Sequence, residues 1–299
     1  PGVRGLSITG DYWRMKQRDA ISALSNADVL ALDELALDLA TRAGLAAGKP
    51  IYQIDLGSGT SGYAGSVRVV RRAVTDADRA AFAAFNAAQT STASQRAVVG
   101  EIENMIVDYI NLGSRTLSGI DFGLQYRSPE TSIGRFSLRA EATRNLQRDE
   151  DLSDEGVIID QLGRNGKAKW VGNASIGWTK GNLSANWLTT YYGSFSDTSA
   201  ATTEANYEAL NRPSYINVFD DNGVMRYYYR VKPAIQHTLS ATYAFGGVTS
   251  DLRQPHSLTV TIHNLFDAAP PVADEDNGFV VGTANPRGRQ FRLKYSFAF

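Results

Sequence analysis

A hydrolytic site in this chain would depend on its three histidines, His237, His256 and His263, because the sequence contains no cysteine. A catalytic triad would pair one histidine with an aspartate and with a serine such as Ser240 or Ser257. Nothing in the spacing of these residues specifies such a triad. We therefore expect no catalytic residues and no enzyme activity.

Acidic side chains form several short runs, which offer oxygen ligands of the kind that hard cations prefer. None of the runs has the spacing of a calcium-binding loop, and a solvated loop is the more common role of such a run. The glycine pairs also lack the context of a phosphate-binding loop. We expect no metal site and no cofactor. The acidic runs are 149–151 with Asp154 and Glu155, 220–221, and 274–276.

Tyrosines border a long polar stretch, 194–224, and offer rings that could stack on a sugar or on an aromatic ligand. The candidate ligand-binding residues are Tyr191, Tyr192, Tyr227 and Tyr228. The same positions also suit an aromatic girdle at a membrane interface. Both interpretations stay open from the sequence.

The elements that would position these residues are strands, because apolar and polar residues alternate with a period of two. The last eleven residues place five apolar side chains on one face and polar ones on the other. Similar alternation, bounded by turn residues, recurs in about eight segments. These segments are 6–12, 120–126, 133–146, 170–178, 183–192, 236–245, 257–266 and 289–299.

The polarity of the two strand faces separates two all-β architectures. In a soluble β-sandwich the polar face meets water, whereas in a transmembrane barrel the apolar face meets lipid. Arginine and lysine fall almost entirely on the face opposite the apolar residues, and a cation on the lipid face at the midplane costs about 2–4 kcal/mol. Arg144 is an exception near the end of its strand. The pattern favours an antiparallel transmembrane sheet.

Composition limits the possible partners. The sequence has 30 basic and 31 acidic residues, for a net charge of −1, so it offers no electrostatic footprint for nucleic acid. It contains no apolar run of about 18 residues for a membrane-spanning helix, whereas a barrel strand needs only about ten alternating residues.

The connections between the predicted strands alternate in length. Short links at 128–132, 181–182 and 246–255 alternate with long ones at 19–103, 149–166, 194–224 and 267–288. Short turns on one side and long extracellular loops on the other are typical of outer-membrane barrels. The longest loop contains two helix-like stretches, 28–43 and 76–88. Thr75, with Asp78 three residues later, forms a capping pattern at the start of the second stretch.

The carboxyl end resembles the terminal signature of TonB-dependent outer-membrane receptors. The resemblance rests on the order and spacing of 263–267, Pro270 with Pro271, Asp274, 278–279 and 285–289, followed by an alternating strand that ends in Phe299. Segments 111–122 and 5–20 are similar to earlier strands of the same family. The signature residues are Asn264, Leu265, Phe266, Asp267, Pro271, Pro286, Gly288 and Arg289.

The resemblance implies that residues 1–299 form the carboxyl-terminal part of a 22-stranded barrel in the outer membrane of a Gram-negative cell. Such receptors take up a scarce ligand, which could be a siderophore, cobalamin, an oligosaccharide or a peptide, with energy delivered through TonB. Phe299, with Phe297 and Tyr295, would form the signal for the barrel-assembly machinery. Nothing in this sequence resembles the amino-terminal plug or the TonB box.

Two alternatives to the receptor remain. One is a self-contained small barrel that acts as a passive pore or anchor. The other is a soluble ligand-binding β-sandwich, which would fold in water without detergent.

Overall fold

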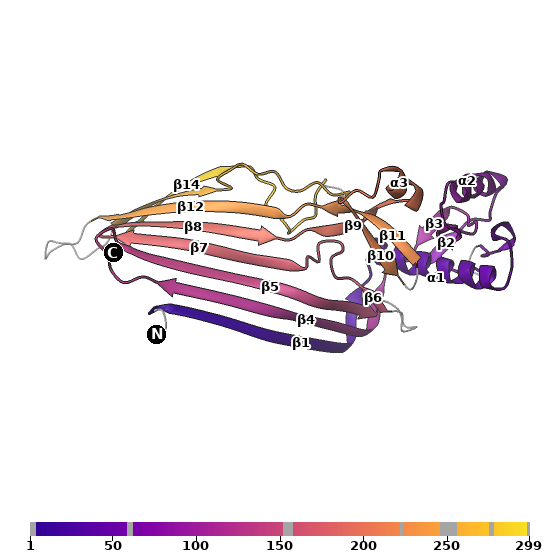
Figure 1. Cartoon of the computed structure of the whole chain (residues 1–299), viewed down its shortest axis with the longest axis horizontal. Coiled ribbons are helices and arrows are strands. Elements are labelled where there is room, and N and C mark those ends of the chain that lie inside the picture. Colours follow the sequence, from indigo (N-terminus) through magenta and orange to yellow (C-terminus); the bar gives the residue numbers. More distant parts are fainter. Residues whose placement is uncertain are drawn as a thin grey trace.

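The computed structural model of the chain describes residues 4–58, 62–151, 158–221, 224–245, 256–274 and 278–297. Antiparallel strands dominate it, and a long sheet at one end of the molecule leads to smaller strands and helices at the other (Figure 1). Within the described ranges the α-helices are α1 (Asn26–Ala46), α2 (Asp76–Ala87) and α3 (Glu204–Ala209), and 3-10 turns span Ile51–Gln53 and Thr92–Ser94. The predicted all-β class is confirmed.

Among the described residues, eight strands form the main path of the largest sheet, in the order β1-β4-β5-β7-β8-β12-β13-β14. Each of the predicted segments overlaps a different strand of this path. The strands are β1 (Leu6–Ala23), β4 (Tyr109–Arg127), β5 (Arg135–Asp151), β7 (Trp170–Lys180), β8 (Leu183–Tyr192), β12 (Ala234–Phe245), β13 (His256–His263) and β14 (Gln290–Phe297). The short strand β6 (Ile158–Asp160) pairs with the end of β5.

Several strands extend further toward the helical end than their alternation predicts. β1 continues to Ala23 and β4 begins at Tyr109, so the inserted segment is 24–108 and not 19–103. β5 runs to Asp151, which places the predicted loop start at 149 inside a strand. In contrast, β13 ends at His263, short of the predicted end at 266, because Asn264 leaves the extended conformation with a φ of 48°.

Short turns join the strands at one end of the sheet. Gly181, with a φ of 56°, lies in the two-residue turn between β7 and β8. The predicted turn 246–255 lies outside the described residues. At the other end, the predicted loop 194–224 contains β9 (Phe195–Thr202), α3 and β10 (Ile216–Asp221), and its last residue begins β11 (Val224–Val231). These strands form a second sheet, ordered β10-β11-β9.

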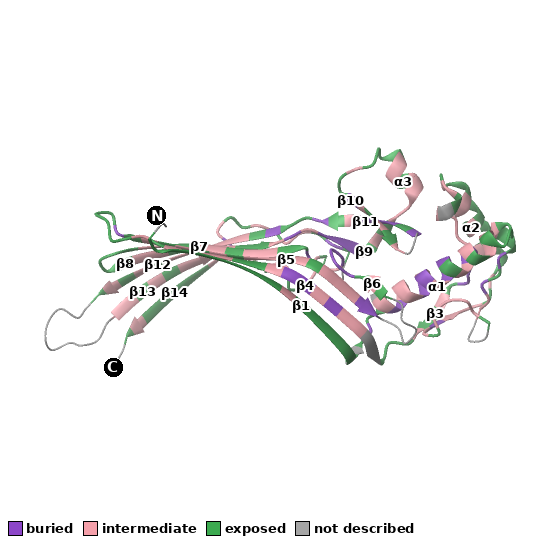
Figure 2. Ribbon diagram, turned by 60° about the horizontal axis from the view of Figure 1, so that its bottom comes forward, coloured by how far each residue is buried: buried purple, intermediate pink, exposed green. Residues whose placement is uncertain are grey.

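The main sheet is open in the described part of the chain. β1 pairs only with β4, and β14 pairs only with β13, so each has one unpaired edge. The edges differ in length, since β1 has 18 residues and β14 has 8. The described strands form a curved wall that does not close into a barrel (Figure 2). A total of 22 strands stays a prediction.

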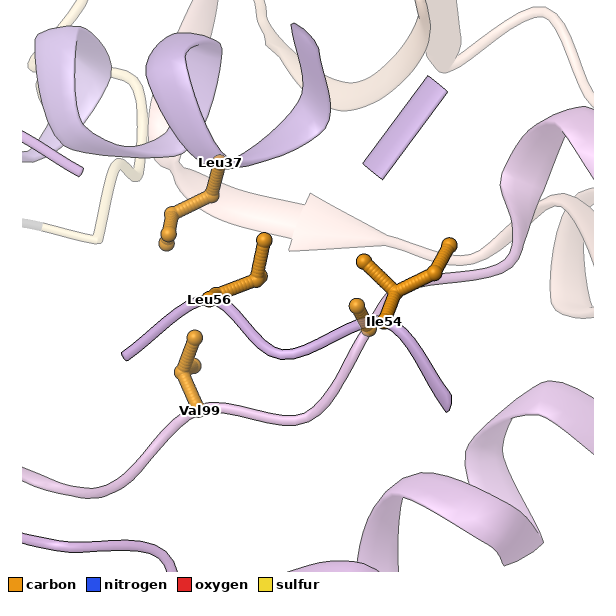
Figure 3. Close-up of a cluster of buried hydrophobic side chains, with 5 residues drawn as sticks. Leu37, Ile54, Leu56 and Val99 are labelled. Atoms are coloured by element: carbon orange, nitrogen blue, oxygen red, sulfur yellow. The ribbon is translucent and has the colours of Figure 1, made fainter. Parts of the chain in front are cut away.

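The buried hydrophobic residues of the described chain lie at the helical end (Figure 2). One cluster consists of Leu37, Ile54, Leu56, Ala97 and Val99, and Figure 3 shows α1 contributing to it from above. Smaller clusters join α1 to β2 (Val69–Arg71), which pairs with β3 (Ile102–Met105), and join β9 to β11. The segment 24–108 is therefore a folded insertion with its own core.

Side-chain caps define where the two longer helices begin. Ser25 caps α1 and Thr75 caps α2, and in each case the third helical residue, Asp28 or Asp78, bonds back to the cap as a capping box. Two hydrogen bonds from Arg72 and those from Thr75 hold the pKa of Asp78 well below its usual range. The sequence-predicted capping of the second helix is thus confirmed.

A buried carboxylate ties the insertion together. Asp33 of α1 is fully buried and accepts hydrogen bonds from the Tyr63 hydroxyl at 2.7 Å, the Ser66 N–H at 2.9 Å and Arg71 Nη2 at 2.9 Å. Burial, together with the bond to Asp33, raises the pKa of Tyr63. An unpaired charge at the buried Asp33 would be costly, so the conformation of the insertion depends on the ion pair between Asp33 and Arg71.

Replacing Arg71 with alanine should selectively loosen the insertion, because the Asp33 carboxylate would lose its only charged partner among the described residues. We expect a loss of about 3–5 kcal/mol in the local free energy of opening, seen as faster hydrogen exchange across α1, β2 and β3. The control is Arg79→Ala, since Arg79 is exposed and its ion pair with Asp76 is 3.9 Å long. Equal exchange in the two variants would contradict the prediction.

Candidate functional site

The register of the main sheet separates its side chains into an apolar face and a polar face. Residues directly opposite one another on paired strands lie on the same face. One unbroken apolar row therefore crosses all eight strands of the path. The row consists of Leu6, Tyr126, Leu138, Ile176, Trp187, Leu239, Ile262 and Phe291.

Many of the large side chains on the apolar face are exposed. Ile176, in a central strand, is 55% exposed, and Phe291 and Leu293 on the edge strand are 72% and 70% exposed. None of the buried clusters of the described residues includes a residue of this apolar row. A continuous exposed apolar face across a whole sheet is unusual for a soluble monomer and marks a surface that contacts lipid or another protein.

The opposite face of the main sheet carries hydrogen-bonding side chains along the same stretches of these strands. Ser240 pairs with Thr261 at 3.1 Å, Thr242 with Thr259 at 2.8 Å, and Thr143 donates to Asp121 at 2.6 Å. One polar row consists of Arg127, Ser137, Gly177, Asn186, Ser240, Thr261 and Arg292. The predicted segregation of polar from apolar residues is present across the sheet.

Aromatic residues lie near both ends of the apolar face. At the helical end, the Arg144 guanidinium lies 5.6 Å from the centre of the Trp170 ring, which stacks on Phe122. This contact accommodates Arg144, the arginine that the sequence identified as an exception to the strand pattern. At the turn end, Tyr295 and Phe297 are 54% exposed and pack with Phe245 and His256. Phe299, the predicted terminal signal, lies outside the described residues.

The signature residues organise the chain between β13 and β14. Asn264 and Asp267 both have positive φ, and the Asn264 side chain exchanges two 2.9 Å hydrogen bonds with the Ala268 backbone. Asp267 Oδ1 accepts from the Arg289 N–H at 2.7 Å, and a Cβ at Gly288 would lie only 2.8 Å from it. These contacts explain why amide, carboxylate and glycine are needed at this spacing.

Other signature residues contribute less to that network. The Leu265 N–H donates to His237 O at 2.8 Å, which joins the segment to β12. Phe266 is 60% exposed and lies against Trp187 and His237. The structure records no side-chain role for Pro271 or Pro286, which lie in the described connection between β13 and β14.

The four tyrosines predicted to bind a ligand do not form one cluster. Tyr191 and Tyr192 are adjacent in β8 and so point to opposite faces of the sheet. Tyr191 is exposed on the apolar face, whereas the Tyr192 hydroxyl donates to Gly166 O. Tyr227 and Tyr228 are buried in β11, on the second sheet. Their role in ligand binding stays a prediction.

A cavity of about 550 Å³, which we call the loop cavity, lies between α1, β6 and the β9–β11 sheet. This volume is in the range of small-molecule sites. Its lining includes Tyr228 and residues of the predicted acidic runs at 149 and 220–221. It also includes residues that the sequence did not single out, namely Asp28, Glu34, Asp160, Arg164 and Arg226. Only the folding of distant segments brings these together.

Two buried arginines hold the walls of the loop cavity in place. Arg164 makes a bidentate ion pair with Asp221 at 2.8 and 2.5 Å and lies 4.3 Å from the centre of the Phe219 ring. Arg226 of β11 reaches α1 through Asp38 at 2.6 Å and Glu34 at 3.3 Å. Burial opposes the charge of each guanidinium, but the neighbouring carboxylates outweigh it and raise the pKa of both.

Two negative findings apply to the described ranges. They contain no group of three or more histidines and carboxylates arranged to hold a metal ion. None of their helices is both long and apolar enough to cross a bilayer.

No protein-family model matches the sequence, and no curated protein matches it. Among solved structures, the chain is similar to a mutant form of the ferric enterobactin receptor PfeA from Pseudomonas aeruginosa, with 14% sequence identity and a TM-score of 0.44. The likeness covers 99% of this chain but 29% of that receptor chain, so this chain spans less than a third of its length. At this TM-score the likeness identifies neither an activity nor a ligand.

An arginine on the apolar face should distinguish a lipid environment from water. For Ile176→Arg we expect a loss of about 2–4 kcal/mol in folding free energy, because the exposed isoleucine would be replaced by a charge near the bilayer midplane. Chemical denaturation of the protein folded in phospholipid vesicles, followed by tryptophan fluorescence, measures this loss.

The control is Asn186→Arg, which places the same side chain on the polar face of the neighbouring strand, opposite Gly177 and Ser240. That variant should change the free energy by no more than about 0.5 kcal/mol. If Ile176→Arg were equally mild, the apolar face would not lie in lipid.

Proposed function

We propose that this chain forms the carboxyl-terminal part of the barrel wall of a TonB-dependent outer-membrane receptor, which takes up a scarce ligand. The observation that carries the proposal is the apolar row, which crosses every strand of the main path on a face that the described chain leaves uncovered. The sequence signature at the carboxyl end supports the choice of family. The role is transport, without a catalytic step.

The free energy of hydration favours lipid over water for this face. Each large apolar side chain gains about 1.5–3 kcal/mol when it leaves water completely. A soluble β-sandwich would obtain that gain from a second sheet packed on the first about 10 Å away. The second sheet of the described chain, β10-β11-β9, lies beyond the end of the first and not across it (Figure 1). This arrangement disfavours the sandwich.

The unpaired edges of β1 and β14 support a larger assembly. Backbone N–H and C=O groups have no water to bond in a bilayer, so each edge needs a partner strand. The edges do not pair with each other in the described chain, although a small barrel would require it. We propose that preceding strands of the same receptor supply the partners, that a plug fills the barrel, that TonB acts through the plug, and that the barrel-assembly machinery inserts the whole.

Cysteine labelling tests the orientation, and the cysteine-free sequence gives a clean background. Thr90→Cys places a thiol on the insertion, and Ser132→Cys places one in the turn between β4 and β5, at positions that are both exposed. A membrane-impermeant maleimide should label the first in intact cells and the second only after the outer membrane is permeabilised. Labelling of both in intact cells, or recovery of the protein without membranes, would refute the proposal.

The mass of the native protein separates the receptor from the small barrel. An antibody against 149–166 should detect, in outer-membrane fractions, a species far heavier than the 32.5 kDa of this sequence. We also expect its uptake of ligand to stop when TonB is deleted. A species of 32.5 kDa would instead favour a passive pore or anchor.

A further inference from the structure

Two buried arginine nitrogens at the loop cavity have no hydrogen-bond partner in the described part of the chain. They are Nε of Arg164 and Nη1 of Arg226, in residues that are 5% and 6% exposed. A buried donor without an acceptor costs free energy, and native structures rarely leave one unexplained. Each of these nitrogens therefore needs an acceptor, which a bound ligand would supply.

The remaining nitrogens of the two arginines hold both side chains in place. The Nη atoms of Arg164 bind Asp221, and Nη2 of Arg226 binds Asp38 at 2.6 Å. Nη1 of Arg226 lies 3.3 Å from Glu34 Oε2, which is close enough for an ion pair but makes no hydrogen bond. Each guanidinium is thus fixed with one donor left over, and a donor that is already fixed binds a ligand at little cost in conformational entropy.

The free donors lie in the walls of two adjoining cavities. Arg164 and Arg226 both line the loop cavity. A smaller cavity of about 220 Å³, which we call the side cavity, shares Glu34, Arg226 and Tyr228 with it. Tyr227, another of the tyrosines that the sequence singled out, lines the side cavity as well.

The charge of the lining argues against an anionic acceptor. Six carboxylates and two guanidinium groups line the loop cavity, and a carboxylate already lies against each guanidinium. A cavity lined mainly by one sign of charge repels ligands of that sign. The acceptors that Arg164 and Arg226 require are therefore neutral oxygens, as in a hydroxyl or a carbonyl group. The six carboxylates are Asp28, Glu34, Asp149, Asp160, Asp220 and Asp221.

The carboxylates of the lining can also accept hydrogen bonds from a ligand. Asp149 accepts from Gln147 Nε2 at 2.5 Å, and its cross-strand partner Asp160 accepts from the Leu162 N–H at 2.8 Å. An ionised carboxylate has about four lone-pair sites, so these contacts leave spare capacity. A ligand hydroxyl both donates and accepts, which suits the aspartates as well as the free arginine donors.

Apolar side chains complete the lining. Leu30 and Leu35 of α1 and Ile158 and Ile159 of β6 line the loop cavity, together with the ring of Tyr228. Ligand sites commonly combine such a surface with a few polar groups that fix the orientation of the ligand. The C–H groups of a ring that carries hydroxyls would pack on this surface.

We propose that the loop cavity binds a neutral polyhydroxylated ligand of the sugar class. Its oxygens accept from Arg164 Nε and Arg226 Nη1, its hydroxyls donate to carboxylates of the lining, and its carbon skeleton packs on α1 and β6. This assignment names the ligand class of the proposed transporter and rests on the proposed function only for the uptake step.

Three matched hexoses test the charge requirement. Glucose is neutral, glucuronate carries a carboxylate and glucosamine an ammonium group on the same ring. The native protein is purified in a detergent without a sugar headgroup and mixed with all three for saturation-transfer difference NMR, with empty micelles as the background. We expect the strongest transfer to glucose. No transfer to glucose, or stronger transfer to either charged hexose, would overturn the proposal.

Lysine variants test the two free donors. Arg164→Lys and Arg226→Lys keep a positive charge for Asp221 and Asp38 but remove the unpartnered nitrogens. Each should weaken glucose binding roughly tenfold, which corresponds to about 1.4 kcal/mol. The control is Arg79→Lys, which changes an exposed arginine of α2 outside both cavities and should leave binding unchanged.

A bulky side chain tests the site without removing any polar contact. Ala201 is exposed and lines both cavities, so Ala201→Trp should fill the space and abolish glucose binding. Ala80→Trp, at an exposed position of α2, should bind glucose normally. We expect the two tryptophan variants to have the same thermal midpoint. Unchanged binding in Ala201→Trp, or in both lysine variants, would place the sugar elsewhere and overturn the assignment.

The test of the ligand class is independent of the test of transport. Binding in micelles does not depend on membrane orientation. Failure of glucose to bind, with successful cysteine labelling, would reject the ligand class alone. Binding of glucose with failed cysteine labelling would reject only the transporter.

Discussion

The cross-strand register of the main sheet is the constraint on which the rest of the structure depends. Because side chains alternate with a period of two, a slip of one residue would move the apolar row to the polar face. The row from Leu6 to Phe291 is continuous only in the observed register. The register also determines which strand ends lie side by side at the helical end. The loops that leave those ends enclose the loop cavity.

The sequence predicted the middle of each strand better than its ends. Alternation is visible where one face is apolar, as in 6–12 of β1, and disappears beyond Tyr12, where Arg14, Lys16 and Arg18 continue the same face. Those residues still pair with β4, because backbone hydrogen bonding does not require apolar side chains. The capping pattern at Thr75 is local, and it correctly placed the start of α2.

The loop cavity could not be predicted from the sequence, because its lining residues come from segments that are far apart in the chain. Asp149 and Tyr228 each belonged to a conspicuous run, but nothing in those runs indicates that both line one cavity together with residues of α1. Arg164 and Arg226 carry no motif, and their importance comes from burial and from carboxylates as distant in sequence as Asp38. Contacts of this kind require the fold to be known first.

The unequal strands give the wall an uneven height. At roughly 3.3 Å per residue, the 18 residues of β1 extend roughly 60 Å and the 8 of β14 less than half of that. In the proposed membrane orientation, a bilayer core about 30 Å thick would span the short side alone. The long side, with β4 and β5, would then extend beyond the bilayer and carry the insertion at its far end (Figure 1). In that orientation a solute would meet a wall that is high on the β1 side and low on the β14 side, so its approach would be unobstructed only from the low side.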